Sequence, residues 1–184
     1  MSFLTDFDLL TLRLQLTPFT EGDVELFHSI NTDQHIRRYL WDDEEISYEV
    51  AEDIMSRSAL FFQNENYGLW KVIEMSSKEV TGYVGLWFFF DEDQPQLIYA
   101  ILKPFTGLGY ATEAARAIIK YAFNNLKFSY LIASMDKPHR KSQAVAQRLG
   151  MHISRQSVKK GKNTIFYIIE NPHVLDEDER LMLE

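Results

Sequence analysis

The stretch from residue 98 to residue 123, IYAILKPFTGLGYATEAARAIIKYAF, most constrains what this chain can fold into. An apolar segment leads into a loop with Gly107 and Gly109, and the loop runs directly into an alanine-rich segment with helical spacing. This order predicts a strand, a loop and a helix in immediate succession. The first amides of a helix have no partner within it and carry a partial positive charge, and glycines allow an anion to approach closely. The junction is therefore a candidate phosphate or pyrophosphate site.

Two familiar phosphate motifs can be compared with this loop. A P-loop requires Lys followed by Ser or Thr after its last glycine, but a Tyr-Ala pair follows Gly109, which excludes that motif. A dinucleotide-binding fingerprint fits better, because Gly107 and Gly109 open it and Asp136 lies at the end of the next expected strand. Its third glycine would fall on Thr112. A dinucleotide-binding protein stays as an alternative.

The rest of the chain predicts a single α/β domain. Hairpins in the middle and helical crossovers later indicate a mixed, mostly antiparallel central sheet flanked by helices on both faces. The expected strands cover 9–16, 67–74, 79–90, 96–102, 130–135, 151–158 and 164–170. The first expected helix is capped by Thr20, with Asp23 three positions on. Further helices are expected over 31–63, with a break at the acidic residues 42–45, over 110–126, and over 142–149, where Gly150 ends the last one.

Composition limits the partners of the chain. Its 184 residues include no Cys, which excludes disulfides and Cys-based zinc sites, and the histidines have no metal-ligand spacing, so we expect no metal. A net charge of −8 argues against nucleic acid, and it either attracts cationic substrates such as amines or only keeps the protein soluble. The longest apolar run, 84–90, is far shorter than the ~20 residues of a membrane span, and the N-terminus lacks the features of a signal peptide. We expect a cytoplasmic protein without a membrane partner.

Three segments in the right order resemble a known family. Residues 106–111, Thr-Gly-Leu-Gly-Tyr-Ala, resemble the acyl-CoA pyrophosphate loop of the GNAT superfamily of N-acetyltransferases, which is Gln or Arg, any two residues, Gly, any residue, then Gly or Ala. Residues 139–142, His-Arg-Lys-Ser, and 148–151, Arg-Leu-Gly-Met, are similar to its second cofactor-side segment, usually Asn, any two residues and Ser, then Glu-Lys-Leu-Gly-Phe or -Met. The opening residues 10–14 are similar to the branch that includes ribosomal-protein N-terminal acetyltransferases.

The resemblance covers 9–171 and leaves 172–184 as an acidic C-terminal tail. It implies transfer of an acetyl group from acetyl-CoA to a primary amine, on a protein N-terminus or a small molecule, by direct attack on the thioester. Ser142 would protonate the leaving thiolate or hydrogen-bond the sulfur; its structural alternative is a helix N-terminal residue that bonds a backbone N–H. The implied cofactor-binding residues are Ile101, Leu102, Gly107, Leu108, Gly109, Tyr110, Ala111, Thr112 and His139.

Some positions depart from the family pattern. Thr106 stands where Gln or Arg is expected, and His139 replaces the usual Asn. Gln96 occupies the central-strand position where many members carry a carboxylate base, and an amide cannot take up a proton. A non-catalytic acyl-CoA sensor of the same fold is therefore a second alternative. Tyr99 faces either the cleft or the core, the acidic residues 42–45 either recognise a cation or form a solvated loop, and a homodimer stays open.

Overall fold

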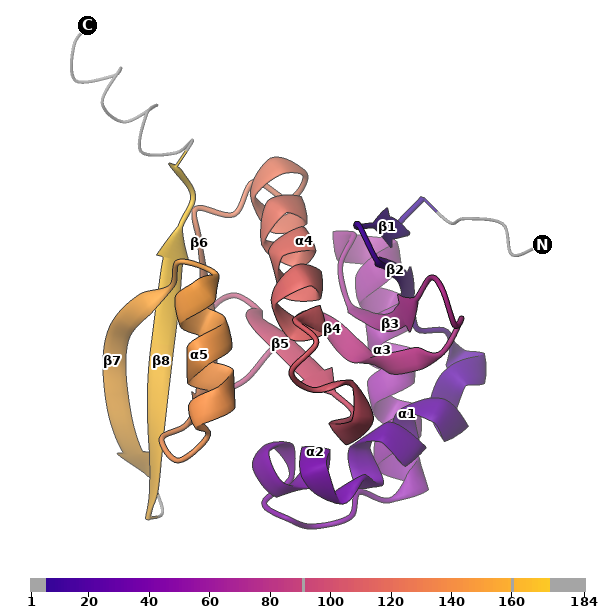
Figure 1. Cartoon of the computed structure of the whole chain (residues 1–184), viewed down its shortest axis with the longest axis horizontal. Helices are drawn as coiled ribbons and strands as arrows, with labels where there is room; N and C mark the ends of the chain where they lie inside the picture. The colour runs from indigo at the N-terminus through magenta and orange to yellow at the C-terminus, as the bar shows by residue number, and fades with distance from the viewer. Residues whose placement is uncertain (1–5, 91, 160, 173–184) are drawn as a thin grey trace, which may run out of the picture.

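The computed structural model describes residues 6–90, 92–159 and 161–172. It has a five-stranded sheet in the order β1-β2-β3-β4-β5 and a three-stranded sheet in the order β6-β8-β7 (Figure 1). The strands are β1 (Leu9–Leu10), β2 (Leu14–Pro18), β3 (Leu69–Glu74), β4 (Val80–Trp87), β5 (Gln96–Ile101), β6 (Tyr130–Asp136), β7 (His152–Lys159) and β8 (Lys162–Glu170). The helices are α1 (Val24–Thr32), α2 (Gln34–Leu40), α3 (Tyr48–Glu65), α4 (Tyr110–Asn124) and α5 (Arg140–Arg148), with short 3-10 helices η1 (Glu21–Asp23) and η2 (Lys103–Phe105).

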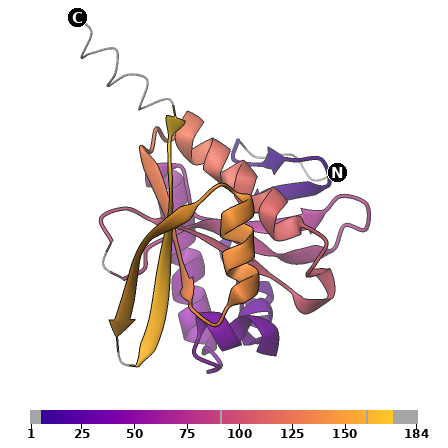
Figure 2. The ribbon, with the colours of Figure 1, turned by 60° about the vertical axis from the view of Figure 1, so that its left-hand side comes forward.

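The helices form a layer on each side of the strands. Helices α4 and α5 lie on one side and α3 lies on the other (Figures 1 and 2). Because successive side chains of a strand point to opposite faces, β5 contributes to both cores. Its Leu97 and Ile101 pack in the core that includes α4, whereas Ile98 and Ala100 pack in the core that includes α1 and α3. The predicted mostly antiparallel sheet with flanking helices is confirmed.

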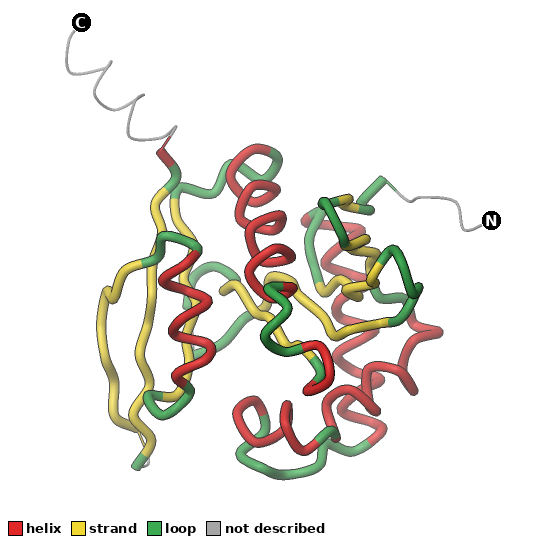
Figure 3. The backbone as a smooth tube through the Cα atoms, in the orientation of Figure 1, coloured by secondary structure: helices red, strands yellow, loops and turns green. Residues whose placement is uncertain are grey.

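The sheet is divided between β5 and β6. The two strands are neighbours in space, yet they belong to separate sheets whose ladders are all antiparallel (Figure 3). A side-chain bond crosses the division near the start of both strands, where Gln94 Nε2 donates to the Tyr130 carbonyl at 2.7 Å. No ladder joins β5 to β6 in the described part of the chain, and we call this division the notch.

Most predicted elements lie within a few residues of their expected positions, but the single strand expected over 9–16 is wrong. Strands β1 and β2 pair with each other, with Leu9 opposite Leu16. The turn between them is made by Thr11, whose Oγ1 accepts from the Leu14 N–H at 3.0 Å. A threonine hydroxyl that bonds nearby backbone competes with an extended ladder, which the apolar alternation does not reveal.

Local signals account for other boundaries. The Thr20 N–H donates to Asp23 Oδ2 at 2.8 Å, as a capped helix start requires. Strand β4 stops at Trp87, earlier than expected, and Phe90 beyond it has a left-handed φ of 59°.

No helix in the described part of the chain is long and apolar enough to cross a bilayer. The predicted acidic tail lies outside the described residues, apart from Pro172.

Candidate active site

A cleft of about 1220 Å³ follows the division of the sheet. It reaches both faces of the sheet, because its lining includes residues of β5 from both cores. Its walls come from β5, the loop before α4, α4 itself, β6, α5 and α2. The predicted site residues that line it are Ile101, Gly107, Leu108, Gly109, Tyr110, Ala111, Thr112, His139 and Ser142.

Leu102 is the predicted site residue that the cleft lining does not include. Its N–H donates to the Thr81 carbonyl at 2.8 Å, and its own carbonyl accepts from the Phe105 N–H at 2.9 Å. Both backbone groups of Leu102 are therefore hydrogen-bonded within the protein. At the end of β5, Ile101 and the residues before it are the ones that can contact a ligand in the cleft.

The loop before α4 presents a row of unbonded amides. Gly107 and Gly109 have φ values of 84° and 86°, a left-handed conformation that favours glycine. Among the described residues, no backbone carbonyl accepts from the N–H groups of residues 107–112, and the first bond of the helix runs from the Glu113 N–H to the Gly109 carbonyl at 3.0 Å. A Cβ added at Gly107 would meet nothing within 4 Å. The loop thus has donors, the positive end of a helix and open space above it, which is the chemistry of an anion site.

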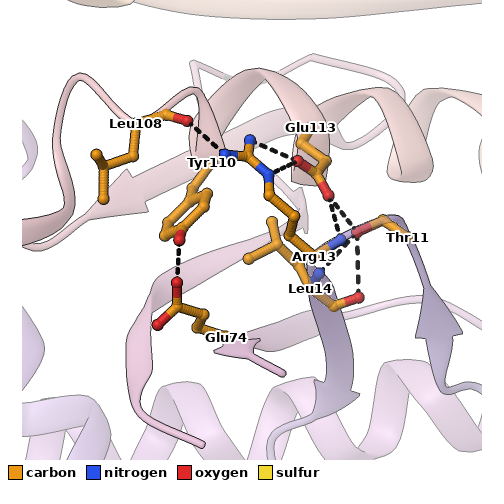
Figure 4. A network of polar contacts seen from close by, with 7 residues as sticks. All are labelled: Thr11, Arg13, Leu14, Glu74, Leu108, Tyr110 and Glu113. Atoms are coloured by element: carbon orange, nitrogen blue, oxygen red, sulfur yellow. Dashed lines mark hydrogen bonds and ion pairs between the residues drawn. The ribbon is translucent and has the colours of Figure 1, made fainter. Parts of the chain in front are cut away.

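Arg13 holds this loop from outside. Its Nε donates to Glu113 Oε2 at 2.8 Å, and its Nη1 donates to the Leu108 carbonyl at 2.9 Å. The guanidinium lies 4.7 Å from the centre of the Tyr110 ring, and the Tyr110 hydroxyl donates to Glu74. Figure 4 shows the Arg13 side chain between Glu113 and Leu108, so the turn after β1 is linked to the start of α4.

Glu113 is the acidic centre of this network. Burial alone would raise its pKa, but hydrogen bonds from the Thr11 hydroxyl at 2.7 Å and the Arg13 N–H at 2.8 Å outweigh burial and hold the pKa below its usual value. Glu113 is therefore ionised at neutral pH. It balances the charge of Arg13 while the amides of the loop stay available.

Four basic residues of the cleft were not found from the sequence. Arg116, Lys120, Lys141 and Arg148 all line it. Arg116 and Lys120 are four residues apart on α4, a spacing that places both on one face of the helix and could have identified them. Arg116 Nη2 also donates to the Arg148 carbonyl at 3.0 Å, which links α4 to the end of α5. These cations add long-range attraction for phosphate groups to the local amides of the loop.

Ser142 and Tyr99 form a pair of hydroxyls inside the cleft. Ser142 Oγ donates to the Tyr99 hydroxyl at 3.0 Å, and the Tyr99 hydroxyl donates to the Ser142 carbonyl at 3.0 Å. The Ser142 hydroxyl is thus directed to Tyr99 and not to the backbone of α5. Burial raises the pKa of Tyr99 to about 12, so its hydroxyl keeps its proton at neutral pH. Tyr99 therefore faces the cleft, and the pair can serve as a hydrogen-bond or proton donor there.

His139 connects the two sides of the cleft. Its ring stacks on Tyr39 of α2 with centroids 3.7 Å apart and planes 2° from parallel. Burial, followed by the nearby charges of His35 and Lys141, lowers the pKa of His139 to about 4. The ring is therefore neutral at neutral pH, with a nitrogen lone pair and one N–H for a ligand.

Gln96, at the position of the family's carboxylate base, and the acidic residues 42–45, considered as a cation site, lie outside the cleft lining. Gln96 is only 1% exposed, does not line the cleft, and donates from Nε2 to the Phe89 carbonyl at 3.0 Å. Its role is to fix the loop after β4. The acidic residues 42–45 do not line the cleft either, and three of their carboxylates are paired: Asp43 and Glu45 with Arg37, and Asp42 with Lys162.

Comparison with known proteins gives a consistent result. The family model described as the acetyltransferase (GNAT) domain matches residues 13–152. The Bacillus subtilis protein YkkB, itself uncharacterised, is 33% identical over 107 residues, which span 56% of this chain and 62% of YkkB. An Agrobacterium tumefaciens acetyltransferase structure has a TM-score of 0.76 at 20% identity, covering 92% of this chain and 97% of that one. RimL, a ribosomal L7/L12 α-N-protein acetyltransferase solved with coenzyme A, has a TM-score of 0.73 at 15% identity, covering 88% and 96%.

Proposed function

This chain belongs to the GNAT acetyltransferase family, and from that premise we propose that it transfers an acetyl group from acetyl-CoA to a primary amine by direct attack of the nitrogen on the thioester. The observation that carries the proposal is the row of unbonded amides at residues 107–112, within a cleft that reaches both faces of the divided sheet. The amides suit a pyrophosphate, and the cleft gives an amine access to a thioester from the opposite side.

The residues of the cleft fit acetyl-CoA along its length. The amides of the loop before α4 would hold the pyrophosphate, and Arg116, Lys120 and Arg148 supply positive charge for the phosphates. Leu97 and Ile101 offer an apolar surface beside the pantetheine arm. The cosubstrate supplies an activated acyl group in the form of a thioester. The chain's own task is to orient that thioester and to exclude water from it.

The Ser142 and Tyr99 hydroxyls would meet the leaving sulfur. Ser142 is 8% exposed, and its hydroxyl proton is directed to Tyr99, so rotation of that hydroxyl toward the sulfur would supply the donor when negative charge develops there. The Tyr99 hydroxyl keeps its proton at neutral pH and donates it to the Ser142 carbonyl, so it would return a proton to Ser142 Oγ only after rotating from that carbonyl to Oγ. A ribosomal-protein N-terminus, the class named for RimL, is one acceptor that belongs to this proposal, and small-molecule amines are another.

Calorimetry with acetyl-CoA, CoA and NAD tests the cofactor assignment. Gly109→Trp places a large side chain among the amides, and we expect it to weaken CoA binding at least ~100-fold, about 2.7 kcal/mol. Gly161→Trp is the control, because Gly161 also has a left-handed φ, of 79°, but lies in the β7–β8 turn; a Cβ at Gly161 would meet nothing within 4 Å, and one at Gly109 would meet only the flexible end of Arg13, Nη2 at 3.4 Å. Tight binding of NAD in place of CoA would favour the dinucleotide alternative. Equal CoA affinity in both variants would refute the loop assignment.

A further inference from the structure

The cleft continues to the face of the sheet opposite α4. On β6, Leu131, Ala133 and Met135 are buried in the core that includes α4. Because side chains alternate along a strand, Ser134 and Asp136 project to the opposite face. Both line the cleft, as do Ile98 and Ala100 of β5 on that same face. The cleft therefore has a part on the face of the sheet opposite α4, away from the loop before α4, which we call the second compartment.

The walls of this second compartment are largely apolar. Helix α2 contributes Ile36 and Leu40, and the loop after β4 contributes Phe89 and Phe90. Tyr39 and His35 of α2 and Thr164 of β8 also line the cleft, and the neutral His139 ring stacks on Tyr39. The basic residues Arg116, Lys120 and Arg148 come from α4 and the end of α5, on the pyrophosphate side, whereas Lys141 of α5 is near enough to His35 to lower its pKa.

Asp136 is the unpaired carboxylate of the cleft. Among the described residues that line it, the acidic side chains are Glu113 and Asp136. Glu113 is bonded to Thr11 and Arg13. Asp136 is partly buried, and its carboxylate makes no hydrogen bond or ion pair with any described residue, although its backbone carbonyl accepts from the His139 N–H at 2.9 Å. Burial raises the pKa of Asp136, as expected for a carboxylate without a cation beside it.

We propose that Asp136 binds the ammonium group of the acceptor and takes its proton, and that the acceptor is a primary amine with a single positive charge and an apolar or aromatic body. The inference rests on the proposed acetyl transfer. A carboxylate in this place supplies what Gln96 cannot, since Gln96 is an amide, is buried and lies outside the cleft. The apolar walls set the chemistry of the body attached to the nitrogen.

The reaction balances with this assignment. The acceptor R–NH₃⁺ gives one proton to the Asp136 carboxylate, and the neutral nitrogen attacks the thioester carbonyl. The new C–N bond forms, the C–S bond breaks, and the second nitrogen proton is lost as the thiolate gains one through Ser142. The products are R–NH–COCH₃, CoA–SH and the proton on Asp136, which passes to water.

A polyamine suits this compartment poorly. Its first ammonium would meet Asp136, but a second would lie against Phe89, Phe90 or Leu40, or approach the cations of the pyrophosphate side. An unpaired cation against apolar side chains is unfavourable. The net charge of −8 attracts any amine from a distance, so selection between amines takes place in the compartment itself.

The test uses 2-phenylethylamine as acceptor, spermidine as the polycation, and 2,2-difluoro-2-phenylethylamine, which has the same shape and a far more acidic ammonium. Asp136→Asn keeps the side-chain shape but cannot take a proton. Asp53→Asn, on α3 with 66% side-chain exposure, removes the same charge outside the cleft. Acetyl-CoA affinity and thermal stability are measured for each variant beside kcat/KM.

We expect the wild type to prefer 2-phenylethylamine over spermidine. Asp136→Asn should lower kcat/KM for 2-phenylethylamine on the order of 100-fold, and for the difluoro analogue only a few-fold, because that nitrogen is already largely neutral. Acetyl-CoA affinity should change less than two-fold, and Asp53→Asn should match the wild type. An equal loss with both acceptors, full activity of Asp136→Asn, or a preference for spermidine would overturn this inference alone. Acetyl transfer to no amine by the wild type would refute the proposed function itself.

Discussion

Replacing Arg13 by Met tests whether CoA binding needs the side chain that holds the loop before α4 in place, because the loop amides proposed to bind the pyrophosphate are left unchanged. Methionine keeps the length of the side chain but removes the guanidinium. The contact with the Tyr110 ring and three polar contacts are lost: Nε to Glu113 at 2.8 Å, Nη2 to Glu113 at 2.6 Å, and Nη1 to the Leu108 carbonyl at 2.9 Å. Glu113 Oε1 still accepts from the Thr11 hydroxyl and from the backbone N–H of residue 13, whereas Oε2 loses both of its described partners.

The magnitude follows from exposure. The Arg13 side chain is 43% exposed and that of Glu113 is 17% exposed. A fully exposed pair contributes ~0.2–1 kcal/mol and a hydrogen bond to a charged group about 1.5–3 kcal/mol, so we expect a loss of about 1.5 kcal/mol for this intermediate case. For a chain of this size that corresponds to a fall in Tm of roughly 3–6 °C. Because Leu108 is no longer held, CoA affinity should fall about tenfold, or 1.4 kcal/mol.

Thermal unfolding and CoA calorimetry measure both effects. Arg57→Met is the matched control, because the Arg57 guanidinium lies 5.2 Å from the centre of the Trp87 ring and pairs with Asp53, but does not touch the loop. A double-mutant cycle with Glu113→Gln gives the coupling energy of the pair. CoA affinity within two-fold of the wild type in Arg13→Met, or a coupling energy below ~0.3 kcal/mol, would show that the loop does not depend on Arg13.

Three further outcomes are expected. Ser142→Ala should lower kcat roughly tenfold or more in steady-state kinetics while acetyl-CoA affinity changes little, and unchanged turnover would remove Ser142 from the mechanism. The folded-state pKa of His139, about 4, lies below its ordinary value, so the unfolded chain binds a proton first as the pH falls. Urea unfolding should therefore show a loss of stability between about pH 6.5 and 4, on the order of 2 kcal/mol after screening. His139→Gln should reduce the dependence of stability on pH in this range. Asn31 is 0% exposed and accepts from the Trp41 indole and the Tyr83 hydroxyl, both at 2.9 Å. Asn31→Leu should therefore cost about 3 kcal/mol in equilibrium unfolding, and a loss below ~1 kcal/mol would show that the two donors find other partners.

The strand, loop and helix at residues 96–124 could be predicted from local sequence patterns. The loop with Gly107 and Gly109 and the alanine spacing after it predict a strand, a loop and a helix, and the structure has β5, η2 and α4 there. These signals are local, since helix spacing and left-handed glycines depend on neighbours in the chain. The prediction that the loop binds a pyrophosphate still depends on the binding experiment.

Features that depend on residues far apart in the sequence could not be predicted from local patterns. The turn at Thr11 interrupts a regular apolar alternation because Glu113, about a hundred positions away, bonds its hydroxyl. The engagement of Leu102 depends on Thr81 of the neighbouring strand, and the burial of Gln96 depends on packing after β4. Asp136 looked like part of a dinucleotide motif, and only the alternation of β6 against α4 places it in a separate compartment.

The divided sheet also has a consequence for local unfolding. No ladder joins the unit made of β6, β7, β8 and α5 to the five-stranded sheet, and the two meet through side chains: the core around α4, Gln94 on the Tyr130 carbonyl, the Ser142 and Tyr99 hydroxyls, and the His139 ring on Tyr39. A ligand in the notch touches both units at once. Segments joined by side chains without a backbone ladder can exchange their amide hydrogens through partial opening, and a ligand that bridges them suppresses that opening in proportion to its occupancy. Amide protection of β6 and α5 should therefore report how much of the protein is loaded, even before any product forms.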